Sequence, residues 1–93
     1  MTRLHIEHPI TDYETWRSAF DRFVEARAAA GVVGTRVSRP VDDDRFIVID
    51  LEFASADAAA GFAAFLEQNI WSTPANSPGL GGHPRTMILD DVD

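Results

Sequence analysis

The chain has 93 residues, enough for one domain expected to span residues 1–93, and a domain of this size buries only roughly 60 to 65% of its unfolded surface. Its 45% of hydrophobic residues can form a core, and the lack of cysteine excludes disulfides, thiolate nucleophiles, zinc–thiolate sites and iron–sulfur clusters. The formal charge of -7, with scattered arginines as the only cations, argues against nucleic acid as a partner.

The first predicted element is a β-strand over residues 3–8. Its apolar face carries Leu4, Ile6 and His8, and its polar face carries Arg3, His5 and Glu7. This strict alternation is typical of a half-buried strand. The segment lacks the apolar stretch of a signal peptide, and no later run is long enough to span a membrane. We therefore predict a cytoplasmic protein with no membrane partner.

A helix is predicted from the capping residue Asp12 to Gly31, because glycine readily takes the left-handed conformation that ends a helix. The helix should pack on the core through one apolar stripe. The side chains at helical spacing in that stripe are Trp16, Ala19, Phe20, Phe23 and Val24.

A β-hairpin is expected after this helix. Residues 34–39 form its first strand, residues 40–45 have the composition of a turn, and residues 46–53 carry the strongest strand signal in the chain. Ser55 then caps a second helix. Its apolar positions are Ala59, Phe62, Ala63, Leu66 and Ile70. A long loop over residues 72–84 leads to a last strand at residues 86–89.

The resulting βαββαβ order predicts a ferredoxin-like α+β fold. Two right-handed crossovers joined by a hairpin give an antiparallel four-stranded sheet in the order 4-1-3-2, with both helices on one face. The other face must be polar or must be covered by another chain.

Charge pairing sets the expected register of the first and third strands. Placing Arg3 opposite Glu52 and His5 opposite Asp50 avoids the like-charge pair that a slip by two residues would create. The helix-free face then carries a polar cluster of Arg3, His5, Glu7, Asp50 and Glu52. We expect this face to form a homodimer, since a monomer would leave apolar side chains of the third strand in water.

A family resemblance covers almost the whole chain. The residues that carry it are Asp12-Tyr13-x-x-Trp16-x-x-x-Phe20 in the first helix, and Glu52-Phe53 leading into Ala59-x-x-Phe62. They resemble the dimeric α/β-barrel superfamily, which includes antibiotic biosynthesis monooxygenase-like proteins, lactone isomerases and haem-binding proteins. The resemblance implies a homodimer whose sheets pack face to face, with a ligand pocket in each subunit between sheet and helices. Haem-degrading members hold iron with a helix histidine, and neither predicted helix contains one.

Aromatic residues provide the candidate substrate-binding side chains. The set of Trp16, Phe20, Phe23, Phe62, Phe65 and Trp71 either lines an apolar cavity for a flat organic molecule or simply forms the core. We predict contacts with the substrate from Trp16, Phe20, Phe62 and Trp71.

Two histidines are the candidate catalytic residues. His8 ends the first strand on its apolar face, and His83 lies in the loop that should return to the same end of the sheet. Imidazoles at the mouth of a pocket are proton shuttles near neutral pH, although water or backbone groups can equally satisfy a histidine at a strand end. No metal is expected, because His5 and the nearby carboxylates match no metal-site signature.

These features predict a small enzyme that works without a cofactor. It would be monooxygenase-like or isomerase-like and would act on a hydrophobic aromatic or polyketide-like molecule. The alternative is a non-catalytic homodimer that binds a ligand or is purely structural.

Overall fold

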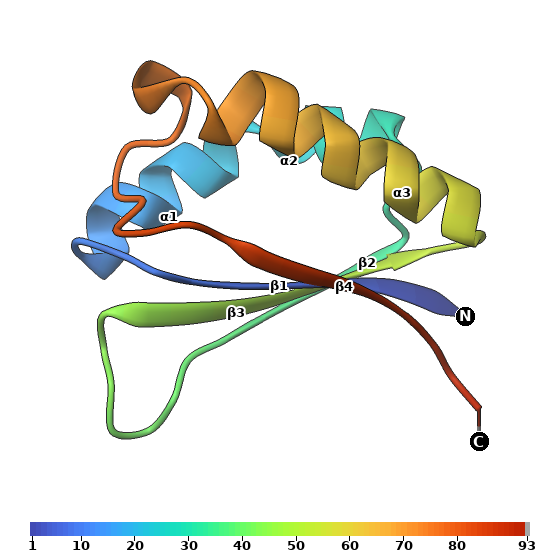
Figure 1. Ribbon diagram of the computed structural model, residues 1–93, viewed down its shortest axis with the longest axis horizontal. Helices are drawn as coiled ribbons and strands as arrows, with labels where there is room; N and C mark the ends of the chain where they lie inside the picture. The colour runs from blue at the N-terminus through green and yellow to red at the C-terminus, as the bar shows by residue number, and fades with distance from the viewer. Residues whose placement is uncertain (93) are drawn as a thin grey trace.

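The computed structural model describes residues 1–92 and has the ferredoxin-like α+β fold expected from the sequence. The sheet is antiparallel with the strand order β2-β3-β1-β4, and the helices lie on one of its faces (Figure 1). The strands are β1 (Thr2–Pro9), β2 (Gly34–Ser38), β3 (Phe46–Phe53) and β4 (Arg85–Asp90). The helices are α1 (Tyr13–Arg22), α2 (Val24–Ala29), α3 (Ala56–Phe65), the π-helix η1 (Leu66–Trp71) and the 3-10 turn η2 (Pro74–Asn76).

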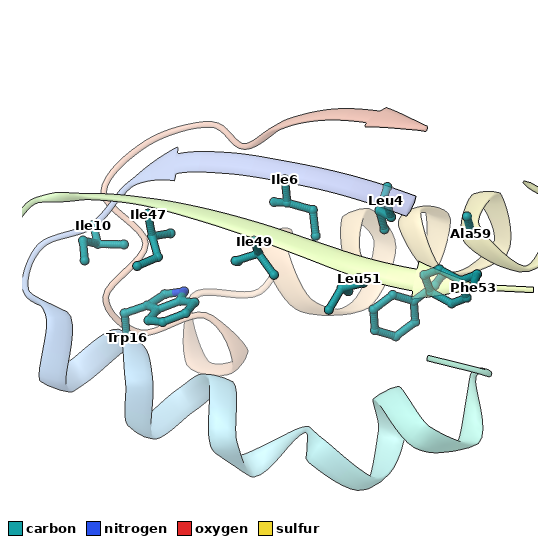
Figure 2. Close-up of a cluster of buried hydrophobic side chains, with 10 residues drawn as sticks. Leu4, Ile6, Ile10, Trp16, Ile47, Ile49, Leu51, Phe53 and Ala59 are labelled. Carbon is teal, nitrogen blue, oxygen red and sulfur yellow. The ribbon is translucent and has the colours of Figure 1, made fainter. Parts of the chain in front are cut away.

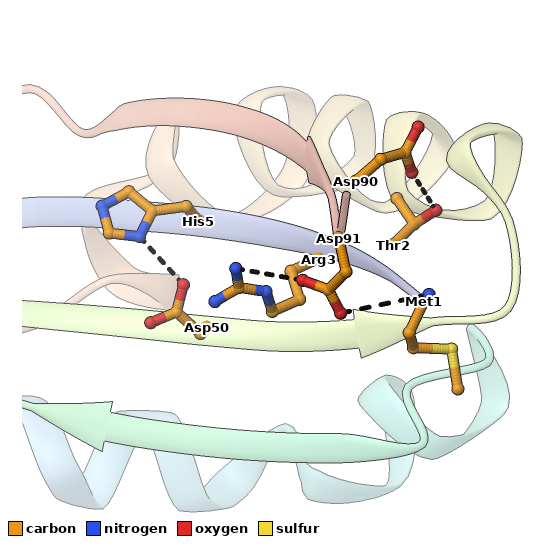
Figure 3. Close-up of polar contacts among 7 residues, drawn as sticks. All are labelled: Met1, Thr2, Arg3, His5, Asp50, Asp90 and Asp91. Atoms are coloured by element: carbon orange, nitrogen blue, oxygen red, sulfur yellow. Dashed lines mark hydrogen bonds and ion pairs between the residues drawn. The ribbon is translucent and has the colours of Figure 1, made fainter. Parts of the chain in front are cut away.

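The register of β1 against β3 is the one predicted from charge pairing. Arg3 lies opposite Glu52, and His5 lies opposite Asp50. The Nδ1–H group of His5 donates to a carboxylate oxygen of Asp50 at 2.9 Å (Figure 3). The predicted polar cluster therefore stands on the open face of the sheet.

The same register puts the apolar row of each central strand under the helices. Figure 2 shows this row from Leu4 and Ile6 across to the β3 side chains and Trp16. The most deeply buried members, each at most 4% exposed, are Leu4, Ile6, Ile47, Ile49, Leu51 and Phe53. Burial of one such side chain stabilises the fold by about 1.5 to 3 kcal/mol, so this row is the main source of stability.

The first helix does not run unbroken to Gly31 as predicted. Phe23 leaves the helical region, and its backbone N–H donates to the Phe20 carbonyl. The Arg27 guanidinium donates to the same carbonyl at 2.6 Å, so that oxygen is occupied by partners other than the Val24 N–H that a continuous helix requires. The chain becomes helical again in α2, whose side chains do not continue the apolar stripe of α1. Val24, expected on the apolar stripe, is consequently 57% exposed.

The second helix also changes type near its end. Ser55 caps α3 by accepting from the Ala58 N–H, as predicted, but residues 66–71 continue as a π-helix. A π-helix has a wider turn than an α-helix, which rotates the residues that follow it. Leu66, Ile70 and Trp71, all within this π-helix, line the space between sheet and helices.

The loop before β4 is fixed to the start of α1. The Thr11 N–H donates to the Gly79 carbonyl at 2.8 Å, and the Gly81 N–H donates to the Pro9 carbonyl at 2.9 Å. Gly79 has a φ of +86°, and a Cβ there would lie 2.7 Å from the Trp16 backbone nitrogen. Only glycine fits at this contact, which brings the loop against Trp16.

Three glycine-to-alanine variants separate backbone strain from steric clash. Gly61→Ala in α3 meets open space and should raise the free energy of unfolding by about 0.5 to 1 kcal/mol. Gly31→Ala also meets open space but keeps a positive φ of 99°, so it should cost about 1 to 2 kcal/mol. Gly79→Ala combines strain with a clash and should cost more than Gly31→Ala. Urea unfolding measures all three, and equal effects at Gly31 and Gly79 would contradict the close approach to Trp16.

Candidate functional site

An apolar cavity lies between the sheet and the helices. It has a volume of about 70 Å³ and is lined mainly by apolar side chains. All four predicted substrate-binding residues border it, namely Trp16, Phe20, Phe62 and Trp71. The other aromatic residues on the wall are Phe23 and Phe65. The polar residues on the wall are His8, Arg27, Asn76 and Ser77.

A continuous row of side chains forms one wall of this cavity. The Trp16 and Phe20 rings, one helical turn apart on α1, stack with centroids 4.9 Å apart. His8, on β1, presents its ring to Trp16 at a centroid distance of 6.4 Å and an interplanar angle of 61°. At the other end, the Arg27 guanidinium lies 3.7 Å from the centroid of the Phe20 ring. Two aromatic rings thus separate a histidine from an arginine.

His8 is held in one tautomer. Its side chain is only 2% exposed, and its Nδ1–H donates to the Pro9 carbonyl at 2.9 Å. The lone pair of the neutral ring is therefore on Nε2. Burial lowers the pKa of His8 below its ordinary value, an effect that the bond to Pro9 only partly offsets. A neutral imidazole in this state can accept a proton.

His83 lies in a different place from the cavity that His8 lines. It is exposed and borders a shallow depression shared with Glu67, Ser72 and Pro84. Trp71 forms part of both the depression and the cavity wall. A joint catalytic role for His8 and His83 stays a prediction.

Arg27 is the functional candidate that the sequence analysis missed. The side chain is 8% exposed, and burial lowers its pKa, although an arginine remains cationic at neutral pH. Its spacing offered a signal, because Arg27 follows Phe20 by seven residues and Phe23 by four, which places it on the apolar stripe. The predicted stripe ends at Val24 and therefore leaves Arg27 out.

The polar cluster on the open sheet face is a second group of functional candidates. His5 also approaches Glu7, with Nε2 to Oε1 at 3.6 Å, so the imidazole stands between two carboxylates. Arg3 pairs instead with Asp91 at 3.3 Å (Figure 3). Within residues 1–92, no three His, Asp or Glu side chains gather in an arrangement able to hold a metal ion. None of the helices in that range has the length and apolarity needed to cross a bilayer.

No protein-family model matches the chain, and no curated protein matches it. Its backbone does resemble solved structures over almost its whole length. A Nitrosomonas europaea protein with a provisional description as an antibiotic biosynthesis monooxygenase superimposes with a TM-score of 0.67 at 15% identity, covering 100% of both chains. A dimeric ferredoxin-like protein from an uncultured marine organism gives 0.66 at 12% identity, covering 99% of this chain and 95% of that one.

A third solved structure contains a bound molecule. It is a monooxygenase from the gene ActVA-Orf6 of Streptomyces coelicolor in complex with the ligand nanaomycin D, with a TM-score of 0.65 at 16% identity, covering 99% of this chain and 88% of that one. The resemblance predicted from the sequence is therefore confirmed at the level of fold: this chain has the fold of antibiotic biosynthesis monooxygenase-like and dimeric ferredoxin-like proteins.

The lowered pKa of His8 predicts a loss of stability on the acid side. The unfolded chain binds a proton at this imidazole near pH 6.5, whereas the folded chain resists protonation until a lower pH. The contribution of neutral His8 is therefore fully present above the unfolded pKa and is lost as pH falls toward the folded one. Urea unfolding across this range should show a flatter pH dependence in His8→Gln. An NMR titration of His8 with a midpoint at or above 6.5 would contradict the assignment.

Proposed function

We propose that the chain is a cofactor-independent monooxygenase-like or isomerase-like enzyme that acts on a hydrophobic aromatic or polyketide-like small molecule. The observation that carries this proposal is the neutral imidazole of His8 on the wall of an otherwise apolar, aromatic cavity. His8 acts as the general base through Nε2, while Trp16 and Phe20 bind the flat face of the substrate.

Either reaction begins with the same proton transfer. His8 removes a proton from a phenolic hydroxyl or from a carbon beside a carbonyl, which leaves an electron-rich enolate or phenolate. In isomerisation the proton returns to a different carbon, and nothing else is consumed. In oxygenation dioxygen is the oxidant: one oxygen atom becomes a ring carbonyl, and the other leaves as water with the two hydrogens lost from that carbon.

The small volume of the cavity is relevant to the alternative, a non-catalytic homodimer. Pockets for drug-sized ligands have volumes of about 300 to 1,000 Å³, whereas this cavity has about 70 Å³. A fused ring system would fit only if side chains on the wall, such as Phe23 and Phe65, moved outward. A protein in which they do not move would be a structural homodimer or a binder of smaller molecules.

We also propose that the open sheet face forms a homodimer. Half-buried apolar side chains, including Phe46 and Val48, share this face with the His5–Asp50 pair. A patch of this kind is typical of a covered surface. One of the similar solved structures is described as dimeric, which supports the same assembly for this chain.

Oxygen consumption tests the catalytic proposal. A hydroxylated anthrone under air should give oxygen uptake with the protein, and His8→Gln should lower the rate by about 100-fold or more. Val41→Ala, in the fully exposed β2–β3 turn, should leave the rate unchanged. His83→Gln in parallel tests the predicted second imidazole. Stabilisation by nanaomycin D without turnover of any substrate would favour the non-catalytic alternative, and an active His8→Gln would contradict the role of His8.

Light scattering after gel filtration tests the dimer. The protein should elute as a dimer at micromolar concentration, and Val48→Asp should shift it toward monomer, because the new carboxylate on the open face would be buried without a partner in the dimer. Val41→Asp introduces the same charge in the exposed turn and should leave the mass unchanged. A monomeric wild-type protein would contradict the proposal.

A further inference from the structure

Arg27 is the only cationic side chain on the cavity wall formed by the described residues other than the titratable His8. More than nine-tenths of the side chain is buried. Within residues 1–92 no carboxylate lies within ion-pair distance of it. The negative charge of Asp21 raises the pKa of Arg27, but the Asp21 carboxylate is itself paired with Arg17 at 3.1 Å.

The known contacts of Arg27 do not use its full bonding capacity. Nη1 donates to the Phe20 carbonyl, and the face of the guanidinium covers the Phe20 ring. These contacts lie at the break between α1 and α2. They leave further N–H donors of the planar fork, which is suited to bind a carboxylate or another planar anion through two bonds. A buried cation without a counterion is costly, and an anionic guest would offset that cost.

The position of Arg27 limits where such an anion would bind. The side chain forms the partition between the cavity and a shallow groove along α1, α2 and β2. Phe20 borders both spaces as well, whereas Trp16 and His8, the rest of the row, border the cavity and not the groove. A flat molecule lying against this row has the guanidinium at one end and the basic Nε2 at the other.

We propose that the cavity takes an anionic aromatic molecule, a ring system bearing a carboxylate or an ionised phenol or enol, whose negative group binds the Arg27 guanidinium. This inference rests on the proposed function, because it assumes that the cavity holds the substrate. It adds a requirement for a negatively charged substrate to that function. The ring of the substrate stacks along Phe20 and Trp16, and the atom that loses its proton lies toward His8.

A matched pair of ligands tests the charge requirement. The probes are 2-naphthoate and 2-naphthamide, which have the same ring system and differ in charge. Trp16 and Trp71 are the only tryptophans of the chain, and both line the cavity, whereas the groove has none. In a nitrogen–proton NMR spectrum the Trp16 indole N–H resonance therefore reports binding inside the cavity, whereas a shift of Trp71 alone also fits binding in the depression beside His83.

We expect the naphthoate to bind about tenfold or more tightly than the amide, a preference worth about 1.4 kcal/mol. Arg27→Gln should reduce the preference to less than about threefold, by weakening only the naphthoate. Arg27→Lys keeps the charge but not the fork and should give an intermediate value. Arg22→Gln removes an exposed cation of α1 that does not line the cavity and should leave the preference intact. If Arg27→Gln fails to fold, the wild-type ratio and Arg27→Lys still decide the question.

The outcomes separate this inference from the proposed function. Equal binding of both probes with indole shifts would overturn the anion preference and leave the cavity as a substrate site. A naphthoate preference that survives in Arg27→Gln would overturn the role of Arg27. Naphthoate binding that leaves the Trp16 indole unmoved would place the anion outside the cavity and overturn the inference. Failure of both probes and of nanaomycin D to shift either indole would overturn the inference and the proposed substrate cavity together.

Discussion

The register of β1 against β3 is the constraint on which the rest of the structure depends. The two strands have equal length and pair along all of it, so each residue of β1 is assigned to one face of the sheet by its partner. A slip by one residue would move every apolar side chain of a strand to the open face. The correct pairing buries Leu4 and Ile6, brings His8 to the cavity and leaves His5 beside Asp50 on the opposite side.

The sequence was informative where local chemistry decides the structure. Strand-forming residues after a turn matched β3 to the residue, Ser55 identified the start of α3, and like-charge avoidance selected the pairing of His5 with Asp50. It was uninformative where a distant group intervenes. At the break at Phe23 the Arg27 side chain donates to the Phe20 carbonyl, and a periodic pattern of apolar residues carries no trace of such a bond.

In the candidate site, too, local patterns were predictive and the positions set by distant parts of the chain were not. Aromatic residues at helical spacing identified the wall of the cavity, including Trp16 and Phe20, because burial follows from periodicity. The buried position of Arg27 was missed, since charged side chains are rarely buried without a partner and the stripe was read as apolar only. The location of His83 depended on the path of a long loop, which composition does not determine.

The position of β1 in the sheet delays formation of the cavity during folding. This strand precedes every other element in the chain yet lies between β3 and β4, so both of its neighbours are synthesised long after it. Pairing across such separations requires the closure of long loops, which slows folding. During translation β1 would expose two unpaired edges and an apolar row, a state prone to aggregation. The cavity is completed only when the loop carrying Gly79 reaches Thr11, which makes the binding site among the last parts of the molecule to form.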